Sequence, residues 1–154
     1  VSLLKDSGIK TQIVKKYLPV MNKFIRKYLG ELDLPIHFVL DEQFNESVSS
    51  PLHQDFSYAS FSEGQKGRID LSLMLTWREV CRLKNSVSTN ILFLDEVFSG
   101  SLDETGKELL LHILRYTLDD TNVVVVDHTL SDAFKDKFDR NILVTRNGGF
   151  SKYN

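Results

Sequence analysis

The sequence predicts an α/β fold in which helices flank a mostly parallel sheet. Continuous apolar runs at residues 91–94 and 123–126, and a further one that fills most of the segment 141–144, alternate with segments whose apolar residues recur every three or four positions. Apolar strands separated by helices are typical of a parallel sheet that is covered on both faces. An Asn-Gly-Gly turn at 147–149 precedes a last strand at 150–153, which predicts a C-terminal hairpin.

The composition is that of a globular domain with its own core. The chain has 154 residues, of which 42% are hydrophobic and 26% charged, and this excludes a disordered tail or a fibre. The single cysteine, Cys81, cannot form an internal disulfide, and no apolar run approaches the roughly 18 residues of a membrane-spanning helix. We therefore expect a cytoplasmic protein without a membrane partner. The chain starts at Val1 without a Met and without the pattern of a signal peptide. We therefore expect this sequence to be a segment of a longer protein, entered midway.

The charge is unevenly distributed, although the formal net charge is only -2. Residues 1–30 hold seven basic side chains and one acidic side chain, a net +6, whereas residues 31–60 hold six acids and no Lys or Arg, a net -6. The total charge therefore gives no argument for nucleic-acid binding, and any such argument must be local.

The first predicted element is a helix over residues 9–29, where apolar residues recur at helical spacing. Pro19 should kink or split this helix, and Gly30 should end it. Residues 36–40 then predict a strand, and a second strand is possible near 43–46.

The serine-rich stretch at 45–60 predicts a loop. Ser62 is a good N-cap for a long helix that runs to about Leu83. The face that we expect this helix to bury carries Ile69, Leu73, Trp77, Val80 and Cys81. The polar stretch 85–90 ends it, and further helices are predicted at 103–118 and 131–138.

Two adjacent carboxylates, Asp95 and Glu96, follow the apolar strand at 91–94. In open parallel sheets, ligands bind at the carboxyl ends of the strands. Adjacent carboxylates can divide the work of phosphoryl transfer, because one can hold Mg²⁺ while the other orients or deprotonates a water molecule. We assign Asp95 to the metal and Glu96 to the water. The alternative is that the pair only ends the strand in solvent.

Three weaker features accompany this pair. Ser62 and Gly64 stand at a predicted helix N-terminus, where free N–H groups and the helix dipole attract anions. His128 follows the strand at 122–126 and can donate to a phosphate oxygen. Asp103 follows Glu96 after a short loop. The alternatives are ordinary N-caps for Ser62 and Asp103 and a structural histidine.

Together, the order and spacing of these features resemble those of ABC-type ATPases. Phe61-Ser62-Glu63-Gly64-Gln65 is similar to the signature motif, 91–96 to the Walker B strand, Ser101-Leu102-Asp103 to the D-loop, and Asp127-His128 to the switch histidine. The similarity is greatest to the SMC and SbcC branch of coiled-coil repair ATPases, in particular to the large subunits of bacteriophage recombination endonucleases. The fold that this resemblance implies is the C-terminal lobe of a three-layer ABC-type head.

The resemblance divides the chain into two parts and implies missing partners. Residues 1–30 would be the end of a coiled coil with a basic helix, and residues 31–154 would be the C-terminal lobe. The sequence contains no G-x-x-x-x-G-K-S/T loop, which in this family lies in an N-terminal lobe. We therefore expect an ATP hydrolase only when this chain is joined to that lobe, and an inactive chain alone.

The family also implies roles for the residues of one head. Asp95 would serve Mg²⁺, Glu96 would be the catalytic base, and His128 would contact the γ-phosphate of ATP bound by the same head.

The remaining residues would serve a second head in a homodimer that encloses two ATP molecules. Ser62, Gly64 and Gln65 would contact the γ-phosphate of the opposite head, and Ser101 and Asp103 would lie at the interface. Glu63 replaces the Gly that is common in the family. A carboxylate near a triphosphate is unfavourable unless it points outward or pairs with Lys66 or Arg68.

The basic helix at 1–30 has two functional interpretations, a DNA-facing surface or a docking site for a nuclease subunit. We rank docking first because an apolar stripe could bury area against a partner. This stripe comprises Leu18, Met21, Phe24, Ile25 and Tyr28. The alternatives are a solvated helix face and a stripe that mostly faces the domain's own core.

The leading functional hypothesis is an ATP-driven head for DNA recombination and double-strand-break repair with a nuclease subunit, in the host-cell cytoplasm if the chain is phage-encoded. The alternative is a non-hydrolysing module of the same fold that tethers DNA or protein. A transporter ATPase fits less well, because a Lys-rich helix precedes the signature-like segment and the chain ends soon after Tyr153.

Overall fold

The computed structural model describes residues 6–50, 53–56, 58–84 and 89–153, with side chains from residue 15 onward except at 50, 53–56 and 147. The predicted coiled-coil residues before Asp6, the proline turn at 51–52 and the polar stretch at 85–88 lie outside the described residues. No described helix is long and apolar enough to cross a membrane.

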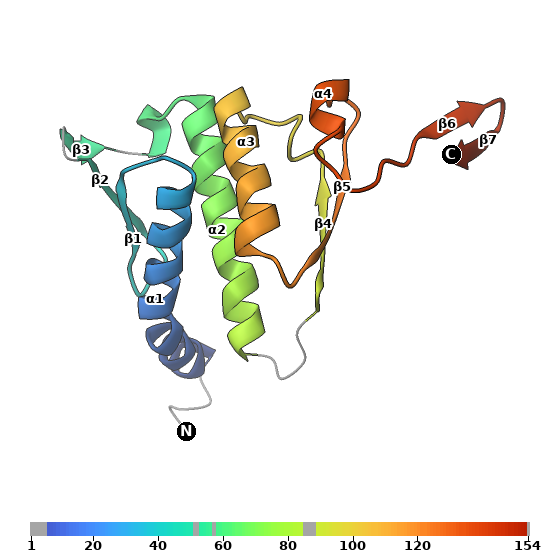
Figure 1. Cartoon of the computed structure of the whole chain (residues 1–154). Coiled ribbons are helices and arrows are strands. Elements are labelled where there is room, and N and C mark those ends of the chain that lie inside the picture. Colours follow the sequence, from blue (N-terminus) through green and yellow to red (C-terminus); the bar gives the residue numbers. More distant parts are fainter. Residues whose placement is uncertain (1–5, 51–52, 57, 85–88, 154) are drawn as a thin grey trace.

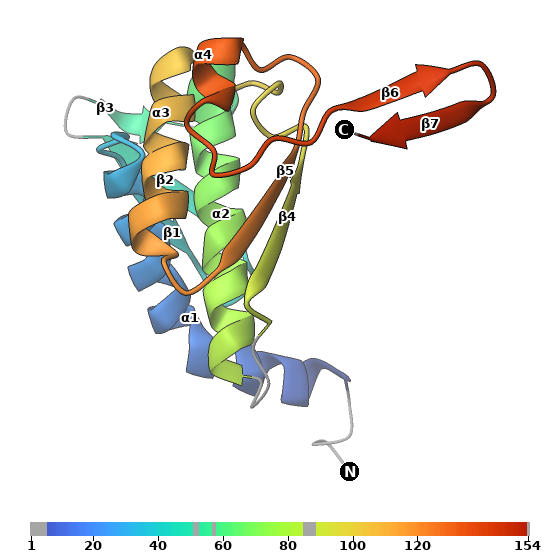
Figure 2. The ribbon, with the colours of Figure 1, turned by 45° about the vertical axis from the view of Figure 1, so that its right-hand side comes forward.

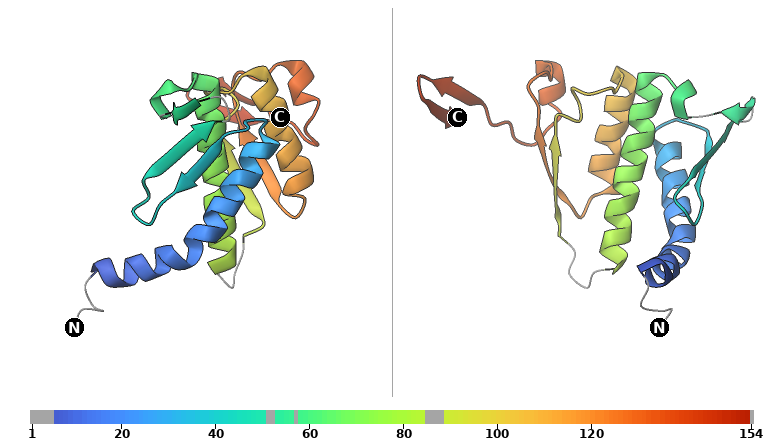
Figure 3. Two further views of the ribbon diagram at one scale, coloured as in Figure 1. Left: turned by 90° about the vertical axis from the view of Figure 1, so that its left-hand side faces the viewer. Right: turned by 180° about the vertical axis from the view of Figure 1, so that it is seen from behind.

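The described elements form three layers, with helices between two sheets (Figures 1 and 3). The helices are α1 (Asp6–Glu31), α2 (Glu63–Lys84) and α3 (Glu104–His112). On one side lies an antiparallel sheet of β1 (His37–Leu40), β2 (Glu46–Ser50) and β3 (His53–Phe56). On the other side lies a parallel pair of β4 (Ile91–Asp95) and β5 (Asn122–Val126). The predicted α/β class is confirmed, and among the described residues the parallel pairing is limited to these two strands.

Helix α1 continues through Pro19 to Glu31. Its dark-blue N-terminal part runs in a different direction from the rest, as the predicted kink requires (Figures 2 and 3). The helix ends in a Schellman motif, in which the Leu34 N–H donates to the Leu29 carbonyl at 2.9 Å. Asp33, with φ of 50°, takes the left-handed position. The helix therefore ends one residue beyond the predicted stop at Gly30.

The apolar stripe of α1 faces the protein's own core. Met21, Ile25 and Tyr28 are at most 2% exposed, and they pack among residues of α2 and of both sheet layers. Leu18 and Phe24 are half-buried against the same clusters. Of the two interpretations of this stripe, the one in which it faces the domain's own core is correct, so its area is not available for docking a nuclease subunit.

Two strands occupy the serine-rich segment for which a loop was predicted. β2 pairs with β1, and β3 pairs with β2, both antiparallel. Val48 in β2 is 7% exposed and packs in the same cluster as Phe38 of β1. This burial outweighs the local preference of serine for turns.

The strand predicted near 43–46 is a turn instead. The Asp41 carboxylate accepts hydrogen bonds from the backbone N–H groups of Gln43 and Asn45, both at 2.8 Å. These bonds hold residues 41–45 in a compact turn, and the strand begins at Glu46.

Helix α2 begins after the predicted N-cap Ser62 and packs against two core clusters. Ile69 and Val80 belong to the cluster beside the antiparallel sheet, whereas Leu71 and Leu75 belong to the cluster beside the parallel pair. The buried surface therefore spans two stripes, and the predicted buried face is only partly correct. Trp77 is 47% exposed and Cys81 is also exposed.

Helices cover one face of the parallel pair. Leu94 is 1% exposed and packs in the cluster that also holds α3 residues. On the other face, apolar side chains are open to solvent: Ile91 (43%), Phe93 (65%), Val124 (39%) and Val126 (55%). Coverage on both faces was predicted, and within the described residues only one face is covered.

The C-terminal elements follow the prediction with shifted bounds. Asp103 caps α3, which continues as a π-helical turn over Ile113–Thr117. α4 (Asp132–Lys135) is shorter than the helix predicted at 131–138. β6 (Val144–Asn147) and β7 (Phe150–Tyr153) form the predicted hairpin, which extends away from the other layers (Figures 1 and 2). The strand predicted at 141–144 begins only at its last residue.

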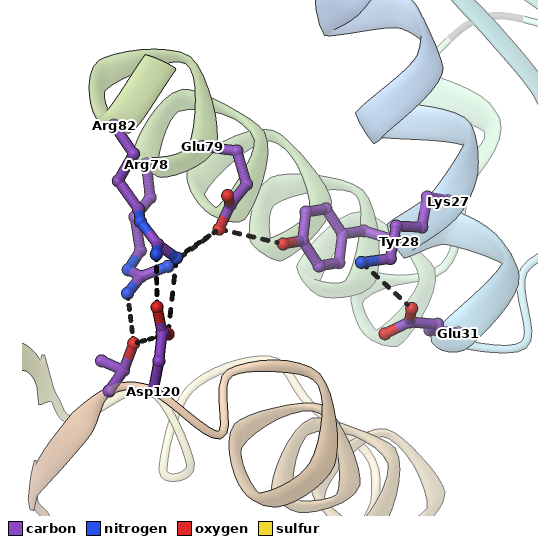
Figure 4. A network of polar contacts seen from close by, with 8 residues as sticks. Lys27, Tyr28, Glu31, Arg78, Glu79, Arg82 and Asp120 are labelled. Atoms are coloured by element: carbon purple, nitrogen blue, oxygen red, sulfur yellow. Dashed lines mark hydrogen bonds and ion pairs between the residues drawn. The ribbon is translucent and has the colours of Figure 1, made fainter. Parts of the chain in front are cut away.

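A polar network joins α1, α2 and the segment before β5 (Figure 4). The Tyr28 hydroxyl donates to Glu79 at 3.4 Å, and Glu79 also accepts from Arg78 at 2.8 Å. Arg78 in turn donates to Thr121, and Arg82 pairs with Asp120. This network fixes the start of β5 relative to the two helices.

Candidate functional site

The predicted site residues all lie at one end of the molecule. In Figure 1, the N-terminal ends of α2 and α3 and the carboxyl ends of β4 and β5 share the upper end. Contacts divide these residues into two groups. One group contains Glu96 and His128, and the other contains the α2 N-terminus and the 101–103 loop.

The first group comes from the ends of the two parallel strands. Asp95 is the last residue of β4, lies opposite Val126 and is exposed. Glu96 follows it with φ of 54°, a left-handed conformation that costs a non-glycine residue about 1 kcal/mol or more. The Glu96 N–H donates to the Val126 carbonyl at 2.8 Å. This bond holds the strained residue at the edge of the sheet.

His128 lies beside Glu96. Its Nδ1 is 3.3 Å from Glu96 Oε1, and the two side chains are 72% and 64% exposed. A carboxylate and an imidazole at this distance can exchange a proton, and both remain open to a ligand. The structure therefore brings together the two residues to which catalytic roles were assigned.

Asp127 is a residue whose contribution the sequence did not indicate. Its Oδ1 accepts from the backbone N–H and the hydroxyl of Thr129, at 2.7 and 2.8 Å. Burial raises the pKa of Asp127, but hydrogen bonds from Thr129 and Ser99 outweigh burial and hold the pKa below its usual range. An ionised Asp127 thereby closes a short turn around His128 through its bonds to Thr129.

The second group begins with a capping box at the start of α2. The Ser62 hydroxyl accepts from the Gln65 N–H at 3.3 Å, and the Gln65 side chain accepts from the Ser62 N–H at 3.0 Å. The capping interpretation of Ser62 is therefore correct. It does not exclude a ligand, because a hydroxyl that accepts one bond keeps its proton for donation.

Gly64 faces the 101–103 loop. A Cβ at this position would lie 3.7 Å from the Ser101 carbonyl oxygen and from the Asp103 side chain. Glu63 is 79% exposed and pairs with Lys66 at 2.8 Å. The unfavourable carboxylate thus points outward with a cation beside it, which is the arrangement that the sequence required.

Asp103 is held by a partner that the sequence did not identify. Arg68 donates to both of its carboxylate oxygens at 2.9 Å, and the Gly106 N–H donates to Oδ1 at 2.8 Å. These bonds, from Arg68 first and Gly106 second, hold the pKa of Asp103 below its usual range. The side chain is 55% exposed, so one side of it still faces solvent.

Two glycines bring the second group into close contact. A Cβ on Gly67 would lie 2.8 Å from the Ser101 hydroxyl, and a Cβ on Gly106 would lie 2.8 Å from Asp103 Oδ1. Neither Gly67 nor Gly106 was singled out from the sequence, although the spacing of Gly64 and Gly67 on one helix, with Gly106 one turn into the next, is the signal that could have indicated this approach.

A cavity of about 310 Å³ connects the two groups. Its lining includes Gly67 and Met74 of α2, Glu96 after β4, and Ser101 of the loop. Asp95 and His128 do not line it.

The residues present fit Mg²⁺ only together with a nucleotide. Among the described residues, no group of three or more His, Cys, Asp or Glu side chains could hold a metal ion. Mg²⁺ at phosphate sites is commonly bound by one or two carboxylates, with phosphate oxygens and water completing its shell. A lone exposed Asp95 at the carboxyl end of a parallel strand meets that requirement.

No protein-family model matches the chain, but known proteins do. The chain is 48% identical over 126 residues to exonuclease subunit 2 of Enterobacteria phage T4 and 44% identical over 126 residues to that of Escherichia phage RB69. Each alignment covers 82% of this chain and 22% of the relative, so the chain spans about a fifth of the length of these curated relatives. It is also 27% identical over 147 residues to the DNA double-strand break repair Rad50 ATPase of Methanocaldococcus jannaschii, covering 95% of this chain and 14% of that protein.

Solved structures confirm the fold. An SMC head domain from Thermotoga maritima matches with a TM-score of 0.65 at 23% identity, covering 96% of this chain and 51% of that one. A structure from work on ATP-driven dimerization of SMC ATPases matches with a TM-score of 0.73 at 14% identity, covering 94% and 88%. The chain thus corresponds to about half of the T. maritima head.

Proposed function

Because this chain belongs with the Rad50 and SMC ATPase heads, as a homologue of phage exonuclease subunit 2, we propose that it is the C-terminal half of an ATP-hydrolysing head. Joined to an N-terminal lobe with a P-loop, it would dimerise around two ATP molecules and drive DNA recombination and double-strand-break repair with a nuclease subunit. The observation that carries this proposal is the 3.3 Å contact between Glu96 and His128 at the ends of two parallel strands.

Glu96 is the general base in this proposal. Its carboxylate accepts a proton from the attacking water, while His128 donates to the γ-phosphate. Asp95 would hold Mg²⁺, which when bound neutralises charge on the phosphates. Exposure of all three side chains supports this assignment, because the nucleotide must reach them from outside this lobe.

The second group of residues would act on the opposite head. Ser62 and Gly64 stand at the N-terminus of a long helix, whose free N–H groups favour an anion. Gln65 would have to leave the capping box to reach a phosphate. Ser101 and Asp103 would contribute to the surface between the heads.

The exposed face of the parallel pair supports an N-terminal lobe as partner. Phe93 and Val126 alone are 65% and 55% exposed, and neighbouring apolar residues extend this surface. Contiguous apolar patches of this kind mark an interface. An N-terminal lobe, which would carry the P-loop, is the occupant that we propose for this surface.

A nuclease subunit and DNA remain partners in this proposal, through the basic face of α1. Lys16, Lys23 and Arg26 are exposed, whereas the apolar stripe of the helix is buried. A partner that binds α1 would therefore use charge, and would present phosphates or acidic side chains.

The test is ATP turnover by this lobe co-expressed with its N-terminal lobe. Glu96→Gln should lower kcat by a factor of about 100 or more and accumulate an ATP-bound dimer. Glu104→Gln is the matched control, since Glu104 is 83% exposed and contacts Lys107. Wild-type turnover in the Glu96→Gln head would contradict the proposal. A wild-type head that hydrolyses no ATP, and whose binding to DNA or nuclease does not respond to nucleotide, would instead favour a non-hydrolysing tether of the same fold, for which Glu96 and His128 have no chemical task.

A further inference from the structure

Arg68 joins three elements through one buried guanidinium group. It lies in the second turn of α2 and is 9% exposed. Nη1 donates to the Leu32 carbonyl at 3.0 Å and to the Asp33 carbonyl at 3.3 Å, at the end of α1. Nη2 donates to both oxygens of Asp103 at 2.9 Å, in the loop before α3.

This arrangement requires an arginine. A buried cation is costly unless its hydrogen bonds are satisfied. Nε of Arg68 has no hydrogen-bond partner among the described residues, but Nη1 and Nη2 donate to the carbonyls of a helix C-terminus and to a carboxylate, and both supply negative potential. The planar fork of the guanidinium reaches opposite directions at once, which a lysine ammonium on a flexible stem cannot do.

The packing around Arg68 leaves little room for the end of α1 and the 101–103 loop to move independently of each other. Gly106 is packed so closely that a Cβ would lie 2.8 Å from Asp103 Oδ1, 3.1 Å from Leu102 Cδ2 and 3.4 Å from Arg68 Nε. Leu32 is fully buried. The end of α1 and the 101–103 loop are therefore packed against the same buried side chain from two sides.

We propose that Arg68 is a positioning residue that couples the end of α1 to the D-loop, residues 101–103. A displacement of α1, the helix that leads into the lobe, shifts the Leu32 and Asp33 carbonyls and hence the guanidinium to which Asp103 is bound. Resting on the proposed function, this coupling would relay partner binding at α1 to the surface between the heads.

The coupling is testable by hydrogen exchange, without any nucleotide. Asp103→Asn keeps an N-cap for α3 but removes the charged acceptor of Arg68. The hydrogen bonds of Asp103 are with Arg68 and Gly106, and neither of these residues belongs to α1. Even so, the backbone amides of Leu32, Asp33 and Leu34, which close the helix end, should exchange about tenfold faster.

The controls separate coupling from general loss of stability. Amides of β4 and β5 report global unfolding, and Glu104→Gln removes a neighbouring charge that pairs with Lys107. In Asp103→Asn, hydrogen exchange of the β4 and β5 amides should not become faster. In Glu104→Gln, exchange of the Leu32, Asp33 and Leu34 amides should not become faster. Unchanged exchange at Leu32, Asp33 and Leu34 in Asp103→Asn, or equal acceleration throughout the chain, would overturn the proposal.

Arg68→Lys provides the reciprocal measurement. The lysine keeps the positive charge and can bind the Asp103 carboxylate, but it cannot at the same time reach the Leu32 and Asp33 carbonyls. The Gly106 amide should stay protected while the α1 amides accelerate, and acceleration at neither place would also overturn the proposal. In the reconstituted head, Arg68→Lys should lower kcat with an unchanged KM for ATP. A head that shows no ATP turnover at all would refute the proposed function and leave the exchange result standing.

Discussion

At the scale of single residues, Glu96 combines an exposed carboxylate with an unfavourable backbone. Its φ of 54° costs a residue with a Cβ about 1–2 kcal/mol, whereas glycine adopts it freely. Glycine also increases the conformational entropy of the unfolded chain, which lowers the free energy of unfolding by about 0.5–1 kcal/mol. Glu96→Gly should therefore raise the free energy of unfolding by up to about 1 kcal/mol, measured by urea denaturation.

Glu96→Gln is the control for this prediction, because it removes the charge and keeps the strained backbone. Its free energy of unfolding should stay close to that of the wild type. A glycine variant that is less stable than the glutamine variant would show that the backbone at this position carries no strain. Strain at a residue with a proposed catalytic role is a compromise between stability and function.

Tyr58 gives a pH dependence with a defined sign. Its hydroxyl donates to Asp70 at 2.9 Å, and burial together with this bond raises the pKa of Tyr58 to about 12. A raised pKa means that the folded state binds the proton more tightly. The stabilisation is complete below pH 10, the ordinary pKa, and is lost as the pH rises from about 10 toward 12.

The test compares the wild type with Tyr58→Phe by urea denaturation at pH 8 and at pH 11.5. The variant should be less stable at pH 8, and the difference should shrink at pH 11.5. Tyr116→Phe, at a side chain that is 68% exposed, should show no such change. A Tyr58 difference that stays constant with pH would contradict the assignment.

The sequence identified single site residues better than their partners. Glu96 and His128 stand out because polar residues follow apolar strands at one sheet edge, and this rule depends only on local pattern. Arg68 does not stand out, because its partners Leu32, Asp33 and Asp103 are about 35 positions away in opposite directions. Such a contact depends on how helices pack, which hydrophobic periodicity does not specify.

At the scale of elements, two helical glycines should respond oppositely to a methyl group. Alanine is favoured over glycine by about 1 kcal/mol inside a helix. A Cβ on Gly30 meets nothing within 4 Å, whereas a Cβ on Gly106 meets Asp103, Leu102 and Arg68 within 3.4 Å. Gly30→Ala should stabilise the protein by up to about 1 kcal/mol, and Gly106→Ala should destabilise it by about 1–3 kcal/mol.

Thermal and urea denaturation of the two variants measure this difference. The pair is its own control, since both substitutions make the same chemical change within helices. If Gly106→Ala were as stabilising as Gly30→Ala, the close packing of α2, α3 and the 101–103 loop would be refuted.

The network in Figure 4 is a second test of helix packing. Glu79 is 16% exposed and accepts from Arg78, which is 13% exposed. Glu79→Ala leaves a largely buried cation and the Tyr28 hydroxyl without this acceptor, and it should cost about 2 kcal/mol. Glu108→Ala breaks the surface pair with Lys137 and should cost less than about 1 kcal/mol. Equal losses in urea denaturation would contradict a structural role for the network.

Element boundaries could be predicted where local signals decide them. The hairpin at β6 and β7 follows from its two glycines, and α2 follows from its capping box. β2 could not be predicted, because its serine-rich sequence favours turns and only the burial of Val48 against Phe38 makes a strand favourable. Trp77 was misplaced for a related reason, since α2 packs on two sides and a single-face pattern assumes one.

At the scale of the whole molecule, the parallel pair is the element that the chain leaves incomplete. Its strands are apolar on both faces in the sequence, and one face has helices against it while the other is exposed. A continuous apolar strand predicts coverage on both faces but does not say which chain supplies each cover.

This incompleteness predicts how the lobe assembles. Phe93→Thr and Val126→Thr replace exposed apolar side chains by a residue that still favours strands, so the circular dichroism and thermal midpoint of the lobe should not change. Each should weaken binding to the N-terminal lobe by about tenfold or more in Kd, because burying such a side chain contributes about 1.5–3 kcal/mol. Titration calorimetry measures this loss. Leu143→Thr, at a residue 63% exposed before the hairpin, is the control with a similar exposed apolar side chain. If all three variants bound the N-terminal lobe as tightly as the wild type, the open face of β4 and β5 would not be the surface on which the head is completed.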